Sequence, residues 1–475
     1  MIKGGSALGQ PMASVRDYES DIDHLLARLE RRAAFADILA QRGRGEMVRV
    51  DRQATRASSS PEMQGAAVRV WAGTKWVEAA TSDLTLAGLE VVADALERAL
   101  ESDAVRSDPP GEAATTAGNS LTDPPHPAAE LGFEGMIRLA KDVRDWSTEI
   151  PSIRDSIATI GWHDEERLYV NTAGARCYQS ISRVRGSVAA VAVESGKVEF
   201  DFRSEGGVGG IEWLDFLSEE NVRAVAESAR SLLTAPTPPT GPVNVLLDPG
   251  VTGIFAHESF GHGTEADQFV RDRSYLKPIL GQPVGPEFLT IVDNGAYPGG
   301  WGSIYYDDEG HSGQRTVLVD RGRFVGALHD RETAAVLRAT ATGNTRRSDF
   351  TGRPFVRMTN TYVEPGDWSL DELVKEAKDG VLLEHASSGI EDPLGGQMQL
   401  KVQRGRLIER GELTQAVTSM ALSGRVLDFL RGIRGIGKSE AFSVHPGFCG
   451  KGHSDILPAG TGGSYLLSSA VVGPA

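Results

Sequence analysis

Apolar residues recur along this chain with two different spacings, and each spacing predicts one type of secondary structure. In the first 240 residues, a spacing of three to four predicts helices over residues 15–42, 86–102 and 219–234. Alternating apolar and polar residues predict a hairpin around residues 68–78 and strands at 167–172, 178–193 and 198–203. We therefore expect an α/β domain in this half.

The second half of the chain is dominated by short runs of β-forming residues. A buried strand at 243–247 precedes a helix at 252–262, and strand-like runs punctuated by Gly and Asp follow between residues 288 and 408. Further helices are expected near 330–340, 369–378 and 413–431. The predicted fold class is α+β, with a barrel-like C-terminal domain rich in antiparallel strands that carries the metal site proposed below.

Two segments rich in proline suggest how the chain is divided. The stretch at 235–242, APTPPTGP, is the clearest linker, and it predicts domains at residues 1–240 and 241–475. Residues 103–129 contain Pro, Ala, Ser, Thr and Gly but almost no large apolar side chain. We expect this segment to be a flexible insert within the first domain.

Composition narrows the choice of partners and compartment. The 475 residues include 65 acidic and 49 basic side chains, for a net charge of −16, which disfavours nucleic acid and anionic membranes as partners. No apolar run approaches the ~20 residues that cross a bilayer, and the N-terminus lacks the apolar core of an export signal. The two cysteines, Cys177 and Cys449, are expected to be reduced thiols in a cytoplasmic protein.

The strongest chemical signal is the run His257-Glu258-Ser259-Phe260-Gly261-His262. Histidine nitrogen is a good zinc ligand, and a neighbouring glutamate can take a proton from water beside the metal. The two histidines are five residues apart, so on a regular α-helix they would point about 140° apart. Both rings can face one ion only if the helix is distorted, for example by a π-turn near Gly261. Two unrelated histidines on a helix are the alternative.

A catalytic zinc site usually has three protein ligands. The remaining candidates for the third ligand are the nearby carboxylates and the residues His311, His329, His385, His445, His453 and Cys449. Cys449 stands out because it lies in a glycine-rich segment, although a lone cysteine is more often a small buried apolar residue. Glu265 and Asp267 are candidates to orient the imidazoles through their second ring nitrogens, and solvated carboxylates at the end of a helix are the alternative.

Several motifs, in order, resemble the TldD/PmbA family of metallopeptidases, on its TldD side. They are HESFGHGTEAD at 257–267, TGNTRR at 342–347, VRMTNTYVEPGD at 356–367 and FCGKGHSDILPAGTGG at 448–463, together with the segment GAAVRVWAGTKWVEAATSDLT in the first domain. The likeness extends from about residue 20 to 470. The chain departs from the family pattern at His453, at the long 103–129 insert and near residues 385–389, which lack an expected Gly-Gly.

The resemblance implies that His257, His262 and Cys449 bind one zinc ion per chain and that Glu258 is the catalytic acid/base, although another divalent metal can occupy such a site. It further implies a homodimer, or a heterodimer with a related chain, that binds extended peptides by strand addition. Glycine-rich stretches at 295–303 and 459–463 are candidate peptide-facing edges. The expected activity is hydrolysis of small or unfolded peptides. Two alternatives are a pathway-specific amide hydrolase that matures a peptide natural product and a partner subunit of a heterodimeric protease.

Overall fold

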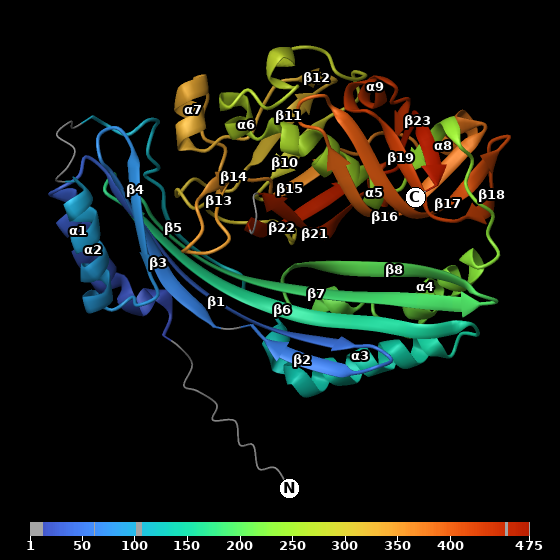
Figure 1. Cartoon of the computed structure of the whole chain (residues 1–475), viewed down its shortest axis with the longest axis horizontal. Helices are drawn as coiled ribbons and strands as arrows, with labels where there is room; N and C mark the ends of the chain where they lie inside the picture. Colours follow the sequence, from blue (N-terminus) through green and yellow to red (C-terminus); the bar gives the residue numbers. More distant parts are fainter. Residues whose placement is uncertain (1–12, 61, 101–106, 452–454, 475) are drawn as a thin grey trace, which may run out of the picture.

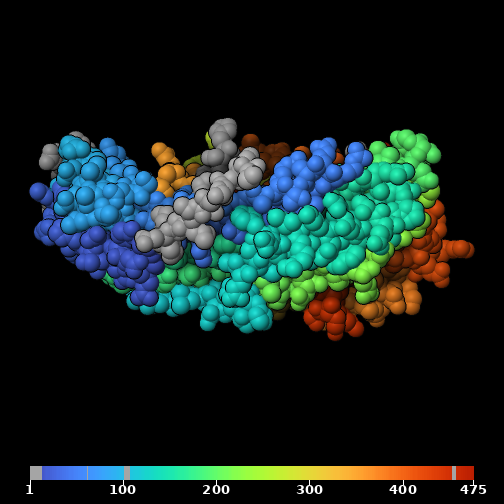
Figure 2. Space-filling model, turned by 90° about the horizontal axis from the view of Figure 1, so that it is seen from below, coloured from blue at the N-terminus to red at the C-terminus, as the bar shows by residue number. Residues whose placement is uncertain are grey.

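The structure is a computed structural model that describes residues 13–60, 62–100, 107–451 and 455–474. A long, curved, mainly antiparallel sheet formed by the N-terminal part lies along one side of the molecule, and the C-terminal part sits against its concave face (Figure 1). Viewed from below, N-terminal residues cover most of the surface and C-terminal residues appear at its rim (Figure 2). The candidate metal-binding residues described below lie in the C-terminal part.

The N-terminal sheet has the strand order β4-β3-β1-β6-β7-β5, with β2 paired to β1 and β8 paired to β7. Its strands are β1 (Ala36–Val50), β2 (Thr55–Ser59), β3 (Met63–Trp71), β4 (Trp76–Thr81), β5 (Ala117–Leu121), β6 (Ile153–Asn171), β7 (Arg176–Glu194) and β8 (Lys197–Val208). The helices are α1 (Glu19–Glu30), α2 (Leu86–Leu100), α3 (Gly132–Thr148) and α4 (Glu219–Leu232). The predicted hairpin around residues 68–78 is confirmed as β3–β4.

The two faces of this sheet differ because side chains alternate along each strand. Along β6, Ala158, Ile160, Leu168 and Val170 pack into the cores formed with the helices. The intervening positions, such as Glu165 and Arg167, face the C-terminal part instead, where polar groups bridge the two parts. Arg69 Nη2 lies 3.2 Å from Glu309 Oε1, and Arg347 Nη1 lies 2.9 Å from Glu78 Oε1.

The C-terminal part combines a barrel with a second sheet. Strands β16, β9, β23, β19 and β17 pair in that order, and β16 also pairs with β17, which closes a five-stranded barrel. The second sheet has the order β12-β11-β10-β15-β22-β21. The predicted α+β class with a barrel-like C-terminal domain is confirmed.

The bounds of the remaining elements are as follows. The barrel and its flanking strands are β9 (Gly241–Leu247), β16 (Gly380–Glu391), β17 (Gln397–Glu409), β18 (Glu412–Val417), β19 (Met420–Arg425), β20 (Gly435–Ile436) and β23 (Leu466–Pro474). The other strands are β10 (Ile291–Asn294), β11 (Arg315–Asp320), β12 (Arg323–Phe324), β13 (Thr345–Arg346), β14 (Phe355–Val356), β15 (Asn360–Val363), β21 (Ser443–Lys451) and β22 (Asp455–Gly463). The helices are α5 (Pro249–Ile254), α6 (Ala266–Val270), α7 (Arg331–Leu337), α8 (Leu370–Ala377) and α9 (Val426–Arg431).

Two predicted helices were wrong in part. The helix expected over residues 15–42 ends at Glu30, and residues 36–50 form β1, which pairs with both β3 and β6. The helix expected over 413–431 is instead β18, β19 and the short α9. In both cases pairing with strands distant in sequence outweighs the local apolar spacing.

The predicted insert at 103–129 includes ordered structure. Residues 117–121 form β5, which extends the sheet by pairing in parallel with β7. Residues 101–106 lie outside the described ranges, so the flexibility of this segment stays a prediction. The division into residues 1–240 and 241–475 also stays a prediction.

Candidate metal centre

The histidines of the HESFGH run lie on a π-helical segment, Phe255–Gly261, that continues directly from α5. The backbone N–H of His262 donates to the carbonyl of His257, five residues earlier, in the π-type pattern. The wider turn brings the two imidazoles to the same side, with ring centroids 5.2 Å apart. The helix distortion expected from the spacing of the histidines is therefore confirmed.

Buried aromatic side chains hold this segment in place. Phe255 packs on Phe429 with ring centroids 4.5 Å apart, and Phe260 packs edge-on against Phe324 at 5.5 Å. Gly261 is required by close packing, because a Cβ there would lie 2.2 Å from Met358 Sδ. The segment is thus fixed on both sides by the core of the C-terminal part.

Cys449 reaches the histidines from β21, at the other end of the C-terminal part of the sequence. Its Sγ lies 3.5 Å from His262 Nε2. One ring nitrogen of each histidine and this sulfur all lie within 4.8 Å of one another. The structure therefore brings together the three residues that the resemblance implies as metal ligands.

The donor set suits a zinc ion on its own chemistry. Imidazole nitrogen and thiolate sulfur are both good zinc ligands, and bonds of about 2.0–2.3 Å place tetrahedral ligands about 3.5 Å apart, which is the observed separation of Cys449 Sγ and His262 Nε2. His257 Nδ1 is buried and has no hydrogen-bond partner among the described residues. A buried nitrogen without a partner is costly unless something binds it, so these residues fit a metal.

The electrostatics of the cluster favour the thiolate. Burial alone would raise the pKa of Cys449, but the His257 and His262 imidazoles beside it outweigh this effect and hold the pKa well below its usual value. Burial likewise opposes protonation of His262, yet the neighbouring Cys449 and Glu265 raise its pKa well above the ordinary value. A thiol poised to ionise next to imidazoles is ready to bind a divalent cation.

Behind His262, a buried ionic cluster joins β21 to the segment after the π-helix. Glu265 Oε2 lies 3.5 Å from His262 Nδ1, as expected for a carboxylate that orients an imidazole. Lys451 Nζ donates to Glu265 at 2.9 Å and to Asp267 at 2.7 Å. Burial opposes ionisation of Glu265, but Lys451 and His262 lower the pKa of its carboxyl to about 2.

This cluster changes one sequence interpretation and adds one residue. Asp267 was a candidate to orient an imidazole, but within the described structure its carboxylate binds Lys451 instead. Lys451 itself was missed, although it lies two residues after Cys449 in the quoted FCGKG segment. Its position relative to Glu265 and Asp267 depends on β21 packing beside the π-helix, which spacing in the sequence does not reveal.

Glu258 points to the open side of the cluster. Its side chain is 25% exposed, and its Oε2 lies 3.9 Å from His262 Nε2. The glycine at position 389 on β16 makes room for it, because a Cβ there would lie 2.8 Å from Glu258 Cγ. Glu258 is therefore placed beside the cluster rather than inside it.

A cleft of about 730 Å³ opens next to His257 and Glu258. It is bordered by β21, by residues 384–389 of β16 and by β8 of the N-terminal sheet. β21 is the last strand of its sheet, and β16 beyond residue 383 pairs with β17 alone within the described ranges. Two strands with an unpaired edge therefore border the cleft.

The glycine-rich stretches proposed as peptide-facing edges have other roles. Residues 459–463 belong to β22, which is paired with β21 on one side and β15 on the other, so this stretch is not an edge. In the stretch 295–303, the carbonyl of Gly299 accepts the N–H of Val208 at 3.0 Å, which ties it to β8. The edge beside the cluster is β21.

The other histidines considered as ligands lie outside the cluster. His385 Nδ1 pairs with Asp201 at 2.7 Å, His445 Nδ1 lies 3.5 Å from Glu205, and His311 Nδ1 lies 3.8 Å from Asp307. His329 is buried, which lowers its pKa to about 4. His453 lies outside the described residues.

Comparison with known protein families identifies the chain. Three family models match along it, described as PmbA/TldA metallopeptidase domain 1 (residues 36–102), central domain (126–235) and C-terminal domain (240–471). A metalloprotease of Methanothermobacter thermautotrophicus is 32% identical over 461 residues, which cover 96% of this chain and 99% of that protein. A zinc metalloprotease TldD homolog of Saccharolobus solfataricus is 34% identical over 235 residues, 49% of this chain and 52% of that one.

A solved structure supports the fold. The crystal structure of TldE from Thermococcus kodakarensis matches 96% of this chain and 100% of its own length with a TM-score of 0.74, at 17% identity. The chain belongs to the PmbA/TldD metallopeptidase family, and the protein is a metallopeptidase, an enzyme that hydrolyses peptide bonds with the help of a metal.

No helix in the described part of the chain is long and apolar enough to span a bilayer.

Proposed function

We propose that the protein is a zinc-dependent peptidase whose metal ligands are His257, His262 and Cys449. The observation that carries this proposal is the convergence of their three ligand atoms within 4.8 Å. The Saccharolobus relative is a zinc metalloprotease TldD homolog, which supports zinc over other divalent metals. Two neutral imidazoles and one thiolate leave a bound zinc with a net charge near +1, which is enough for Lewis-acid catalysis.

Zinc held by these residues supplies the Lewis acidity that polarises the scissile carbonyl and a water beside it. Glu258 is the general base: its carboxylate takes a proton from the attacking water as the water oxygen bonds to the carbonyl carbon. When the C–N bond breaks, Glu258 returns the proton to the leaving amine. Because a thiolate ligand donates electron density and makes nearby water less acidic, a well-placed carboxylate is especially important here.

The substrate is an extended peptide that adds as a strand to the edge of β21. Backbone N–H and C=O groups on an unpaired edge recognise a peptide by its main chain, so many sequences are accepted. Folded proteins expose few free strands and do not fit a cleft of about 730 Å³. Small or unfolded peptides are therefore the proposed substrate class.

The working form is a cytoplasmic dimer, either of two copies of this chain or with a related family member. The similarity to TldE in fold is compatible with a partner of that kind. Size-exclusion chromatography of the chain expressed alone, followed by a cleavage assay with and without a related partner chain, distinguishes the two forms.

The decisive experiment for the mechanism is the variant Glu258→Gln. It keeps the size of the side chain and all three proposed ligands, so we expect the metal content of the wild type and a fall in kcat of at least about a hundredfold on an unstructured peptide. If E258Q cleaves the peptide as fast as the wild type, the assignment of Glu258 as the base is wrong. Comparison of a peptide library with single amides reveals whether the activity is general or restricted to one substrate.

A further inference from the structure

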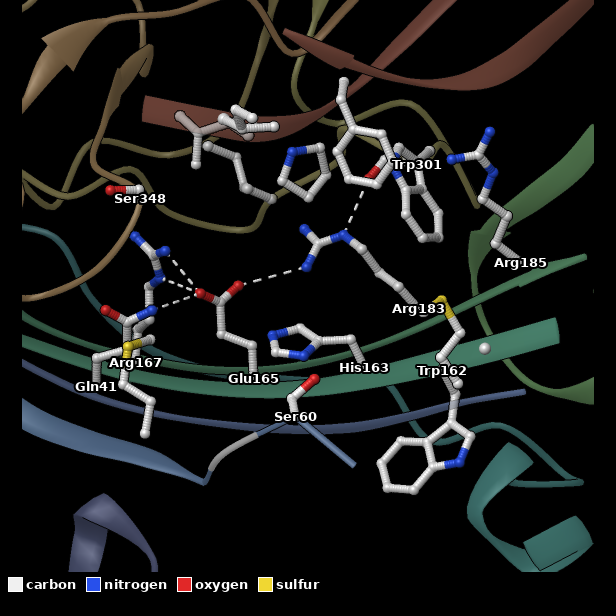
Figure 3. Close-up of a pocket in the computed structure, with 18 of the residues that line it drawn as sticks. Gln41, Ser60, Trp162, His163, Glu165, Arg167, Arg183, Arg185, Trp301 and Ser348 are labelled. Atoms are coloured by element: carbon white, nitrogen blue, oxygen red, sulfur yellow. Dashed lines mark hydrogen bonds and ion pairs between the residues drawn. The ribbon is translucent and has the colours of Figure 1, made fainter. Parts of the chain in front are cut away.

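Arg185 stands at the boundary between two cavities on the concave face of the N-terminal sheet. It lies on β7, where its partner in the neighbouring strand β8 is Gly206. It borders the cleft beside Glu258 and also a second cavity of about 620 Å³ between β6, β7 and the β21–β22 hairpin. Figure 3 shows this second cavity, with Arg185 at one end and Arg183, Glu165 and Arg167 along its floor.

The guanidinium of Arg185 has few partners. Its Nε donates to Ser204 Oγ at 2.9 Å, and its Cζ lies 5.3 Å from the centre of the Phe448 ring. Among the described residues, no carboxylate lies within ion-pair distance of Arg185. Phe448 immediately precedes Cys449 on β21 and also borders both cavities.

Two neighbouring arginines, Arg183 and Arg203, each have a carboxylate partner. Arg183, two residues earlier on the same face, donates to the carbonyls of Trp301 and Ser303, each at 2.9 Å, and its Nη1 lies 3.4 Å from Glu165 (Figure 3). Arg203, which borders the same cleft, has its Nε 3.2 Å from Glu205. Within the described lining of this cleft, Arg185 is thus the arginine whose charge has no carboxylate opposite it.

An arginine in this setting is suited to an anionic ligand. Burial disfavours the charged form and lowers the pKa of Arg185, so its charge is retained at a cost in free energy. The planar guanidinium fork matches a carboxylate in geometry, and charge-assisted hydrogen bonds of this kind are about twice as strong as neutral ones. A carboxylate that binds here relieves the unpaired charge.

We propose that Arg185 binds a carboxylate of the peptide substrate, at its C-terminus or on an acidic side chain, and thereby sets specificity. The proposal rests on the peptidase function proposed above. Because Phe448 beneath the guanidinium is the residue next to Cys449, a carboxylate bound at Arg185 lies beside the strand that carries the proposed ligand. A peptide whose carboxylate is held at Arg185 has a defined register in the cleft. The peptide bond that is cleaved is therefore a fixed number of residues from that carboxylate.

The test compares three short, N-acetylated peptides of otherwise uncharged residues. One has a free C-terminal carboxylate, one a C-terminal carboxamide, and one a carboxamide with a glutamate near that end. For each we measure kcat/KM with the wild type, Arg185→Gln and Arg203→Gln, and the binding constant to the Glu258→Gln protein by calorimetry. Far-UV circular dichroism of each variant shows whether it is folded. The variant Arg185→Lys keeps the positive charge and shows whether recognition depends on it.

We expect the wild type to prefer a carboxylate-bearing peptide over the plain carboxamide by about tenfold or more in kcat/KM. The ratio falls close to one in R185Q, falls less in R185K and is unchanged in R203Q. A preference for the peptide with a free C-terminus assigns the bound carboxylate to the C-terminus. A preference for the glutamate peptide assigns it to an acidic side chain. A wild-type ratio near one, or the same ratio in R185Q, overturns the proposal.

The two readouts separate this proposal from the proposed function. Cleavage that depends on Glu258 but shows no carboxylate preference overturns the role of Arg185 and leaves the peptidase intact. In the second case, calorimetry shows that E258Q binds the carboxylate peptide more tightly and that the R185Q/E258Q double variant loses this preference, while the wild type cleaves no peptide. This result supports the carboxylate site at Arg185 and overturns the proposed hydrolysis. If the wild type neither cleaves the peptides nor prefers a carboxylate in binding, both the Arg185 site and the proposed peptidase function are overturned.

Discussion

His262 Nε2 lies 3.5 Å from Cys449 Sγ, although the two residues are separated by 187 positions in the sequence. The histidine is delivered by a helix widened at Phe255–Gly261, and the cysteine by an edge strand that hydrogen-bonds to β22. A shift of β21 by one residue would turn the cysteine to the other face of the strand. The proposed metal centre therefore depends on the register of the sheet that contains β21 and β22, in addition to the identity of the proposed ligands.

Gly389 is predicted to control the position of Glu258, the proposed catalytic base. An added methyl group in Gly389→Ala would lie 2.8 Å from Glu258 Cγ, so the carboxylate must move. We expect kcat to fall about tenfold or more while the metal content stays that of the wild type. Gly424→Ala, in β19 of the same barrel, is the control, because its nearest neighbour is 3.9 Å away. Equal activity of G389A and wild type would contradict the prediction.

Gly261 is predicted to be required for the packing of the π-helix. In Gly261→Ala the new Cβ would meet Met358 Sδ at 2.2 Å, and overpacking of a core typically costs about 1–3 kcal/mol. We expect a lower midpoint of urea unfolding and weaker metal binding. Because the clash involves Met358, the G261A/M358A double variant should lose less stability than the sum of the single variants. Simple additivity in this cycle would show that the clash is relieved elsewhere.

Lys451 is predicted to hold Glu265 in position behind His262. Lys451→Met removes the cation between two buried carboxylates, and breaking a buried ion pair in this way costs about 3–5 kcal/mol. We expect lower stability and metal affinity about 10–100-fold weaker, as for other losses of groups that orient metal ligands. Lys277→Met, which removes an exposed pair with Asp272, should change stability by at most about 1 kcal/mol. Metal titration and urea unfolding of both variants test this.

Glu165 is predicted to make stability depend on pH in the acidic range. Burial disfavours its ionisation, but Arg167 and Arg183 outweigh burial and lower its pKa to about 2 (Figure 3). Its folded-state pKa is below the ordinary value of 4.5, so its stabilising effect is complete above about pH 4.5 and is lost as the pH falls toward 2.

The matching variant is Glu165→Gln. At pH 7 we expect it to be less stable than the wild type by about 2–3 kcal/mol, with the difference shrinking between about pH 4.5 and 2. Urea unfolding across this range, followed by tryptophan fluorescence, measures the difference. A difference that does not change with pH would mean that Glu165 contributes through packing rather than charge.

Local sequence predicted the features that depend on near neighbours. The five-residue spacing of His257 and His262 predicted a distorted helix, and the distortion was found. The hairpin at 68–78 and helix α2 were also predicted, because their apolar spacing and turn residues agree with their final surroundings.

Features that depend on distant pairing could not be predicted from spacing. Residues 36–42 were predicted as the end of a helix, but they form the start of β1 because strands β3 and β6 flank them. Lys451 and Gly389 are unremarkable in the sequence, and their importance appears only when β21 and β16 lie beside the π-helix. Cys449, the proposed third ligand, was expected through family resemblance and not through spacing.

The whole proposed mechanism requires that His257, His262 and Cys449 bind one metal ion together. The most direct measurement is the metal content of the purified wild type and of Cys449→Ser by mass spectrometry, with the visible spectrum after cobalt substitution. We expect about one zinc per wild-type chain, a thiolate-to-cobalt absorption band in the wild type, and loss of that band with much weaker metal retention in C449S. A wild type without bound metal, or a C449S protein that retains metal and spectrum unchanged, would contradict it.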